Sequence, residues 1–180
     1  WEVSGPAWGR FLLDVCDHWV RHDVGAVQVQ LFEGWIGALL GAPGGLCVHA
    51  PTCGGCLALE HDGALYACDH YVSPEWRLGS LHDEPLAHIV DGRRAMEFGA
   101  AKRNTLDDGC LRCRWLMLCN GGCPKDRAPL GADLRRNRLC AGYTLFFERA
   151  APALVAIVSL LRSGRPASDV MSAAKTWPRL

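Results

Sequence analysis

Residues 110–123 read CLRCRWLMLCNGGC, which spaces four cysteines as C-x2-C-x5-C-x3-C, and Cys140 follows in NRLCAGY. Thiolates at such short gaps can converge on one inorganic centre without a large fold, because a metal can organise the segment that binds it. Five cysteines here, with more upstream, exceed the four ligands that a single site can use. This run therefore predicts two metal centres that share one small scaffold.

The chain has ten cysteines in all, and their spacing bears on their chemistry. They lie at positions 16, 47, 53, 56, 68, 110, 113, 119, 123 and 140. Five disulfides would suit a secreted chain, but the N-terminal WEVSGPAW lacks the basic and then apolar segments of a secretory signal. Adjacent thiols such as C-x2-C are poor partners for a spanning disulfide, whereas they suit a metal in a reducing compartment. The cysteines therefore favour metal ligation in a cytoplasmic protein, with disulfides as the alternative.

The size and hydropathy of the chain bound its organisation. Its 180 residues, 49% of them apolar, suffice for one domain or for a small domain with appendages. The longest apolar stretch, residues 150–161, is shorter than the roughly 20 residues that cross a bilayer, so no membrane contact is expected. The chain begins with Trp1 and opens almost at once on a helix-like segment, which predicts a piece of a longer protein.

Charge is balanced overall but unevenly distributed. The chain has 19 basic and 19 acidic residues; residues 1–92 hold 3 basic and 12 acidic, whereas residues 93–149 hold 12 basic and 6 acidic. A basic segment can indicate nucleic-acid binding. Here it coincides with the cysteines, and a four-iron cluster with four thiolates carries a charge of about −2 that nearby cations would offset. This favours an iron–sulfur site over nucleic acid, with a solvated basic surface as a third possibility. The cations expected to screen the clusters are Arg112, Arg114, Lys125 and Arg127.

The hydrophobic pattern predicts an α+β fold with several helices and one small β-hairpin. Apolar residues recur every three or four positions over residues 8–22, which predicts an amphipathic helix with Cys16 as a buried structural thiol. Asp-Gly between two alternating apolar runs predicts a hairpin of residues 57–60 and 64–68. The further expected elements are a strand at 26–32, helices at 34–40, 84–91, 93–103 and 140–162, loop with single helical turns at 107–137, and a last helix at 168–175 capped by Ser168.

Ligand number alone does not choose between zinc and iron. Nine cysteines remain besides Cys16, so two four-cysteine sites leave one over, and both structural zinc and iron–sulfur clusters accept four thiolates. Zinc ribbons usually pair two C-x2-C knuckles about 15–20 residues apart. The Cys53/Cys56 and Cys110/Cys113 pairs are much further apart in the sequence, which weakens the zinc interpretation.

Three segments resemble a known family. The run CLRCRWLMLCNGGCPKDR from Cys110, the segment ALYACDHYV from Ala64 and LCAGYTLFF from Leu139 resemble a SPASM domain. More closely, they are similar to the C-terminal half of anaerobic sulfatase-maturating enzymes, and the similarity runs from about Trp8 to the end of the chain. In that family a radical S-adenosylmethionine barrel precedes this domain, which binds two auxiliary 4Fe–4S clusters. The resemblance therefore implies cysteine-rich loops organised by two clusters and flanked by N- and C-terminal helices.

The resemblance also implies an interleaved set of ligands. One group, Cys47, Cys53, Cys68 and Cys123, would bind the first auxiliary cluster, and the other, Cys110, Cys113, Cys119 and Cys140, would bind the second. Cys123 would thus serve a different cluster from its neighbours in the run, as one cysteine does in two-cluster ferredoxins. Cys56 is left over, and we expect a buried or free thiol beside the site.

Asp69 has two interpretations. Taken locally, it is a polar residue at the end of a strand. In the sulfatase maturases, the aspartate of the matching C-D pair is a proposed catalytic base, which would take the proton of a target Cys or Ser while a radical removes a Cβ hydrogen. The resemblance therefore implies a catalytic role for Asp69, whereas His70 and Tyr71 are expected to pack or face solvent.

The radical-generating motif of the family is missing from these residues. Cys119 and Cys123 form C-x3-C, but Asp126 stands where C-x3-C-x2-C requires its third cysteine. The resemblance thus implies that S-adenosylmethionine and a third cluster belong to a missing or separate radical domain, with a sulfatase polypeptide as substrate. Residues 1–45 would be the remnant of the barrel, 46–148 the SPASM domain and 149–180 a helical extension. The alternatives are the SPASM domain of a peptide-modifying maturase and a free-standing iron–sulfur or zinc module.

Overall fold

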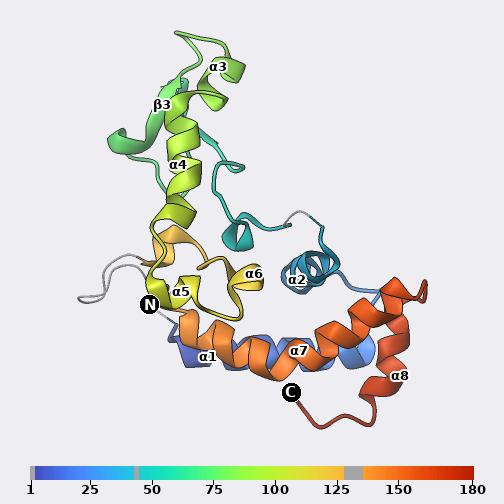
Figure 1. The fold of residues 1–180 in the computed structure, drawn as a ribbon. Helices are drawn as coiled ribbons and strands as arrows, with labels where there is room; N and C mark the ends of the chain where they lie inside the picture. Colours follow the sequence, from blue (N-terminus) through green and yellow to red (C-terminus); the bar gives the residue numbers. More distant parts are fainter. Residues whose placement is uncertain (1–2, 43–44, 128–135) are drawn as a thin grey trace.

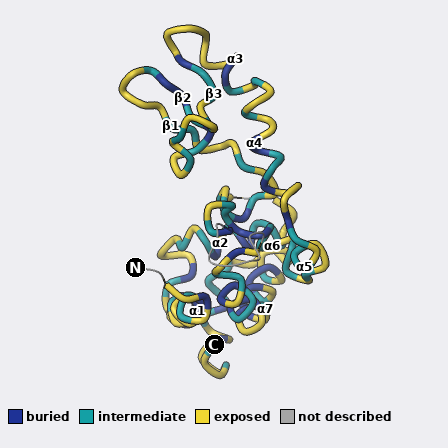
Figure 2. The backbone as a smooth tube through the Cα atoms, turned by 90° about the vertical axis from the view of Figure 1, so that its left-hand side faces the viewer, coloured by how far each residue is buried: buried dark blue, intermediate teal, exposed yellow. Residues whose placement is uncertain are grey.

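The computed structural model describes residues 3–42, 45–127 and 136–180. In Figure 1 the described chain forms a helical body, from which an arm extends that carries the sheet and α4. The helices of the body are α1 (Gly5–His22), α2 (Gln30–Leu40), α7 (Cys140–Arg162) and α8 (Val170–Ala174). Figure 2 shows that most of the buried residues lie in this body, so the hydrophobic core lies there rather than in the arm.

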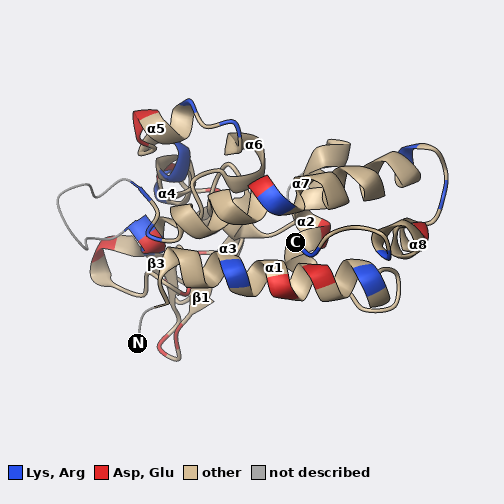
Figure 3. Cartoon of the chain, turned by 90° about the horizontal axis from the view of Figure 1, so that it is seen from below, with Lys and Arg blue, Asp and Glu red and all other residues tan. Residues whose placement is uncertain are grey.

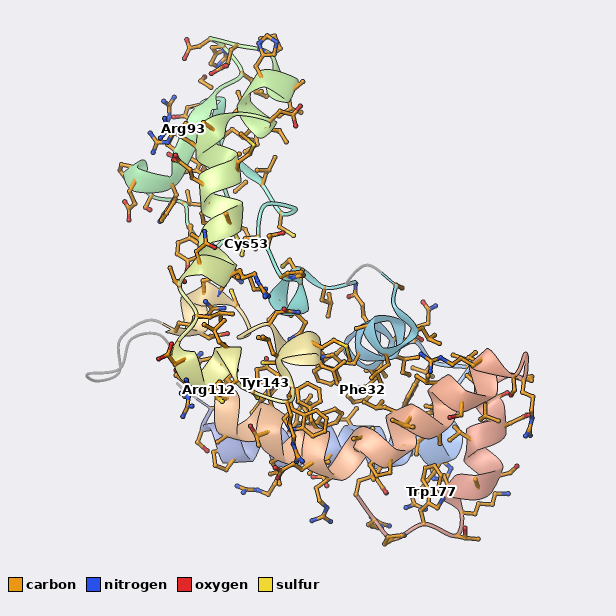
Figure 4. All side chains as sticks on the ribbon, viewed as in Figure 1. Phe32, Cys53, Arg93, Arg112, Tyr143 and Trp177 are labelled. Atoms are coloured by element: carbon orange, nitrogen blue, oxygen red, sulfur yellow. The ribbon has the colours of Figure 1, made fainter. Side chains whose placement is uncertain are left out.

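Aromatic side chains fill the centre of the body. Phe32 and Trp35 of α2 and Phe146 and Phe147 of α7 are almost completely buried. The rings of Phe32 and Phe146 stack with their centroids 5.5 Å apart and their planes at 6°. Offset stacking of this kind stabilises a core beyond the apolar area that it buries. Figure 4 shows Phe32 between α2 and α7.

Helices α1 and α7 approach closely where glycines face each other. Gly5 and Gly9 of α1 meet Gly142 of α7, and an added Cβ on Gly142 would lie 2.9 Å from the Gly9 nitrogen and would overlap the carbonyl of Gly5. Because Gly142 comes two residues after Cys140, this contact fixes the start of α7 against α1.

The arm carries a three-stranded antiparallel sheet in the order β1 (Ala58–Leu59), β2 (Ala64–Tyr66), β3 (Arg77–Ser80). Ala58 pairs with Tyr66 and Ala64 pairs with Ser80. The predicted hairpin is therefore confirmed, and β3 adds a strand that was not predicted. Helices α3 (Leu86–Val90) and α4 (Arg93–Asn104) follow the sheet.

Short helical turns join the arm to the body. They are η1 (Cys47–His49), α5 (Asp108–Leu111), α6 (Leu116–Cys119) and η3 (Pro124–Arg127), with η2 (Pro74–Trp76) in the arm and η4 (Ala167–Asp169) before α8. The prediction of loop with single helical turns holds for the described part of residues 107–137, whereas 128–135 lie outside the described residues.

Two local predictions are wrong. Residues 26–32 form no strand: the chain turns after α1, Trp19 Nε1 donates to the Val27 carbonyl at 2.8 Å, and α2 begins at Gln30. The alternating apolar residues there serve a turn and then a helix, because packing against α7 outweighs local strand propensity. Ser168 does not cap the last helix: it lies inside η4, and α8 begins at Val170 without a side-chain cap.

Helix α7 confirms the helix predicted at residues 140–162 and contains the apolar stretch 150–161. It runs unbroken through Pro152 for 23 residues, and by length and composition alone it could cross a membrane. Its buried face, however, packs against α1 and α2 and forms the centre of the core. Helix α7 continues through residues 148 and 149, where the predicted SPASM domain would end. The division of the chain into three parts stays a prediction.

Candidate metal centres

Two cavities lie where the arm meets the body, and the nine cysteines other than Cys16 divide between them. An upstream cavity of about 400 Å³ is lined by Cys47, Cys53, Cys56, Cys68 and Cys123. A downstream cavity of about 620 Å³ is lined by Cys110, Cys113, Cys119 and Cys140. The structure thus brings together each predicted group of four and adds Cys56 to the upstream group. In Figure 4, Cys53 lies near the lower end of α4 and Tyr143 lies on α7 beside the downstream cavity.

Different elements position the upstream cysteines. Cys47 opens η1, Cys68 follows β2 and Cys123 precedes η3. Cys53 is held by its backbone nitrogen, which donates to the Gly99 carbonyl of α4 at 3.1 Å. The upstream cavity therefore combines thiols from four separate segments. It forms only when the arm folds together with the junction, by which we mean the short helical turns η1, α5, α6 and η3 that join the arm to the body.

A sharp turn separates Cys119 from Cys123. Asn120, Gly121 and Gly122 all have positive φ angles, of 46°, 73° and 64°. Three successive left-handed residues reverse the chain, and glycine adopts this conformation without the steric cost that a Cβ brings. As a result Cys119 lines the downstream cavity and Cys123 the upstream one, although they are four residues apart.

Two buried cations hold this junction. Lys102 of α4, only 1% exposed, donates from Nζ to the carbonyls of Cys47 at 2.6 Å and Val48 at 3.0 Å. Arg127 donates to the carbonyls of Gly121 at 3.1 Å and Lys102 at 2.7 Å. Burial lowers the pKa of Lys102, and the nearby thiols of Cys53, Cys123 and Cys47 oppose that shift. Arg127 was expected to screen a cluster; its contacts show that it ties the turn after Cys119 to α4.

Neutral side chains link the two cavities. Asn120 Nδ2 donates to the His49 carbonyl at 2.7 Å, and His49 Nδ1 lies 3.2 Å from the Cys119 carbonyl oxygen. Burial lowers the pKa of His49 to about 4, so the imidazole is neutral at pH 7 and Nδ1 can act as the donor. Asn137 Nδ2 lies 3.4 Å from the Cys123 carbonyl oxygen and accepts at Oδ1 from the Leu139 nitrogen at 2.8 Å.

Helix ends position the downstream cysteines. Cys110 lies in α5, whose N-cap Asp107 accepts from the Cys110 nitrogen, and Cys119 ends α6. Cys140 is the first residue of α7. Arg136 and Arg138 also line this cavity, and Figure 3 shows basic segments beside α4 and α5.

The thiols of Cys68, Cys110 and Cys119 are protonated at neutral pH in the metal-free chain. Burial is the largest cause that raises the pKa of Cys119 to about 11 and those of Cys68 and Cys110 to about 12. Metal ligands must be thiolates, so binding would displace protons and would be favoured at higher pH. Within the described residues, no group of three or more His, Cys, Asp or Glu is placed to hold a single metal ion. Five thiols line the upstream cavity and four line the downstream one. Each set is large enough for a cluster in which each iron takes one cysteine.

Asp69 stands at the rim of the upstream cavity. Its Oδ1 accepts from the Cys68 thiol at 3.1 Å, its Oδ2 lies 3.9 Å from His70 Nδ1, and its side chain is 65% exposed. The hydrogen bond from Cys68 is the largest cause that lowers the pKa of Asp69. The carboxylate is therefore ionised at neutral pH and open to a partner from solvent.

Other cysteine and basic residues differ in their surroundings. Cys16 is fully buried in the core, as expected, and burial raises its pKa to about 12.

Lys102 and Asn137 were not predicted as site residues, and no sequence motif marks them, because their contacts join segments far apart in the chain. Arg138 lines both cavities and pairs with Asp126 at 3.1 Å. Its position in the basic segment 93–149 was the feature of the sequence that could have indicated Arg138 as a site residue.

The fold and the two cysteine-lined cavities define a cluster-binding domain. The SPASM family model, described as an iron-sulfur cluster-binding domain, matches residues 49–114. The match contains five of the nine cysteines that line the cavities, and Cys47, Cys119, Cys123 and Cys140 lie outside it. The chain therefore carries a SPASM iron–sulfur cluster-binding domain.

Similarity to longer proteins narrows the family. The chain is 35% identical over 97% of its length to a serine-type anaerobic sulfatase-maturating enzyme of Bacteroides thetaiotaomicron, and covers 42% of it. It is 30% identical over 85% of its length to a cysteine-type enzyme of Clostridium perfringens, again covering 42%. A solved structure of native anSMEcpe with bound AdoMet and Cp18Cys peptide superposes with a TM-score of 0.78 at 29% identity, over 89% of this chain and 45% of that one.

These comparisons confirm the resemblance. The homologues of this chain are anaerobic sulfatase-maturating enzymes, of both the serine and the cysteine type. The chain spans about two fifths of the length of the curated relatives that it matches.

Proposed function

We propose that this chain is the auxiliary-cluster part of a radical S-adenosylmethionine sulfatase maturase, which oxidises a Cys or Ser of a sulfatase to Cα-formylglycine. One observation carries the proposal: the cysteines divide between two cavities, four of them around the downstream one and the predicted four, with Cys56, around the upstream one. The homologues and the match to a peptide-bound structure support the choice of a sulfatase polypeptide as substrate.

Each cavity would hold one 4Fe–4S cluster. The upstream ligands are Cys47, Cys53, Cys68 and Cys123, and the downstream ligands are Cys110, Cys113, Cys119 and Cys140. When bound, the clusters would order the junction and accept the electron that leaves the substrate. Lys102 fixes the loop of Cys47, and Arg127 fixes the turn that separates Cys119 from Cys123. Their buried positive charges offset the negative charge of thiolate-bound clusters.

Asp69 would act as the general base. It would accept the proton of the target thiol or hydroxyl, which requires the carboxylate to come within hydrogen-bond reach of that group. Its exposure at the rim of the upstream cavity leaves it open to an incoming peptide. A Cys68 thiolate bound to iron has no proton to donate, so the Oδ1 that accepts from Cys68 in the metal-free chain would become free.

The radical would arise in another part of the protein. Because the residues 1–180 lack C-x3-C-x2-C, S-adenosylmethionine and the third cluster belong to a preceding or separate domain in this proposal, within a cytoplasmic protein. The chain alone should not produce formylglycine. Reading the frame upstream of Trp1 tests this directly, and a C-x3-C-x2-C motif is the expected finding.

Two measurements test the proposal. The chain, reconstituted anaerobically with iron and sulfide, should bind about eight irons, whereas zinc alone or about four irons would contradict two clusters. In a protein that contains both parts, Asp69→Asn should lower formylglycine formation in a sulfatase peptide by about 10²–10⁴-fold at unchanged iron content. The matched control is Asp83→Asn, an exposed carboxylate of the arm. Equal activity of the two variants would remove Asp69 from the mechanism.

A further inference from the structure

Cys56 is a fifth thiol in a cavity for which four ligands suffice. It lines the upstream cavity with Cys47, Cys53, Cys68 and Cys123. It also follows Cys53 at the C-x2-C spacing, which is typical of metal-binding knuckles. Cys56 is therefore a spare thiol that lies among the four proposed cluster ligands.

Among the four predicted upstream ligands, Cys47 is the one whose exposure matches that of Cys56. Both residues are exposed, whereas Cys53, Cys68 and Cys123 are half-buried. Burial is the largest cause that raises the pKa of Cys47, and Cys56 is the next, which indicates that the two side chains interact. Both exposed cysteines thus line the upstream cavity and are open to solvent.

The loop that carries Cys56 has room to adjust. Gly54 and Gly55 separate it from Cys53, and an added Cβ at either glycine would meet no heavy atom within 4 Å. Cys53, in contrast, is fixed to α4 through the Gly99 carbonyl. Two glycines in open space allow Cys56 to shift toward the cavity while Cys53 stays in place.

We propose that Cys56 is a substitute ligand for the iron atom that Cys47 holds. The inference rests on the proposed cluster of the upstream cavity. In the exchange, the Cys56 thiol loses its proton to solvent and its thiolate bonds to the iron, while the Cys47 thiolate leaves the iron and takes up a proton. No electron is transferred, so the exchange needs no oxidant or reductant. When Cys47 is absent, Cys56 completes the fourth ligand position.

Alkylation tests this assignment, since a thiolate bound to a cluster is protected from the reagent. Wild-type chain, Cys47→Ala and Cys68→Ala are reconstituted anaerobically with iron and sulfide, treated with iodoacetamide, and analysed by peptide mass spectrometry. In the wild-type chain Cys56 should be labelled, because Cys47 occupies the iron. In Cys47→Ala the labelling of Cys56 should be lost. In the matched control Cys68→Ala, whose missing ligand lies elsewhere in the cavity, Cys56 should remain labelled.

The outcomes separate this inference from the proposed function. Labelling of Cys56 in iron-loaded Cys47→Ala, at the wild-type rate, overturns the inference alone. A wild-type chain that binds no iron overturns the proposed clusters and the inference with them. If Cys47→Ala fails to fold, as judged by circular dichroism, Cys47→Ser replaces it with a nearly isosteric side chain. Removing the iron with a chelator should restore the labelling of Cys56 in either variant, and continued protection there would contradict ligation.

Discussion

Lys102 Nζ lies 2.6 Å from the carbonyl oxygen of Cys47, and this contact joins the arm to the first cysteine of the upstream cavity. The lysine comes from α4, and the carbonyl belongs to η1, 55 residues earlier. A buried ammonium is costly unless it is hydrogen-bonded, and here two carbonyls accept from it. The position of Cys47 therefore depends on a charge that lies outside the cysteine motifs.

Replacing Lys102 should weaken both the fold and the upstream site. Lys102→Met leaves the carbonyls of Cys47 and Val48 buried without their donor, which should lower the free energy of unfolding by about 3 kcal/mol. Denaturant unfolding of the metal-free chain measures this loss. Lys175→Met, at an exposed lysine of the C-terminal segment, is the control and should change stability by less than about 0.5 kcal/mol. Equal stability of the two variants would show that the buried contacts of Lys102 contribute nothing.

Gly142 should tolerate no side chain. Gly142→Ala places a methyl group against the backbone of α1 at Gly5 and Gly9, so the two helices must separate. Overpacking of this kind should cost about 3 kcal/mol and raise the mobility of Cys140 at the start of α7. Gly34→Ala, inside α2 with open space around it, should instead be neutral or stabilise by up to about 1 kcal/mol. Thermal unfolding of both variants checks the contrast.

An acid-sensitive clamp holds the C-terminal segment against α1. Asp17 accepts from Arg21 at 2.9 Å and from the Leu180 nitrogen at 3.2 Å, and Arg21 also donates to the Pro178 carbonyl at 3.1 Å. The hydrogen bond from Arg21 is the largest cause that lowers the pKa of Asp17. A carboxyl with a lowered folded pKa stabilises the fold above its ordinary pKa, and that contribution is lost as the pH falls through the lowered value.

Asp17→Asn should therefore lower stability near neutral pH by about 1 kcal/mol, a modest value because solvent screens part of the pair. The difference from the wild-type chain should shrink as the pH falls below the ordinary carboxyl pKa. Urea unfolding at neutral and acid pH measures both differences, with the exposed Asp14→Asn as control. A difference that does not change with pH would exclude the ion pair as its source.

The sequence predicts those helices and strands whose apolar spacing or turn residues lie within the element itself. The helices at α1, α4 and α7 and the β1–β2 hairpin follow from spacing and from the Asp-Gly turn. Strand β3 has no such signal, because its residues become a strand by pairing with β2. The strand expected at residues 26–32 fails for the related reason that burial of Phe32 against Phe146 requires a helix there.

The division of the cysteines shows a second limit. Spacing alone groups Cys123 with Cys119, whereas the left-handed turn at residues 120–122 sends them to different cavities. The family resemblance predicted that division because it conveys three-dimensional information that one sequence lacks. The buried contacts of Lys102 and Asn137 were not predicted, since they depend on segments that meet only in the folded chain.

The central claim is that Cys123 belongs to the upstream site and Cys119 to the downstream site. Iodoacetamide labelling of the iron-loaded chain, read cysteine by cysteine, tests it with Cys123→Ala and Cys119→Ala as a matched pair. In Cys123→Ala, Cys47, Cys53 and Cys68 should become labelled while Cys110, Cys113 and Cys140 stay protected; Cys119→Ala should give the reverse pattern. Loss of protection at Cys110, Cys113 and Cys140 in Cys123→Ala, with the upstream cysteines still protected, would contradict the account.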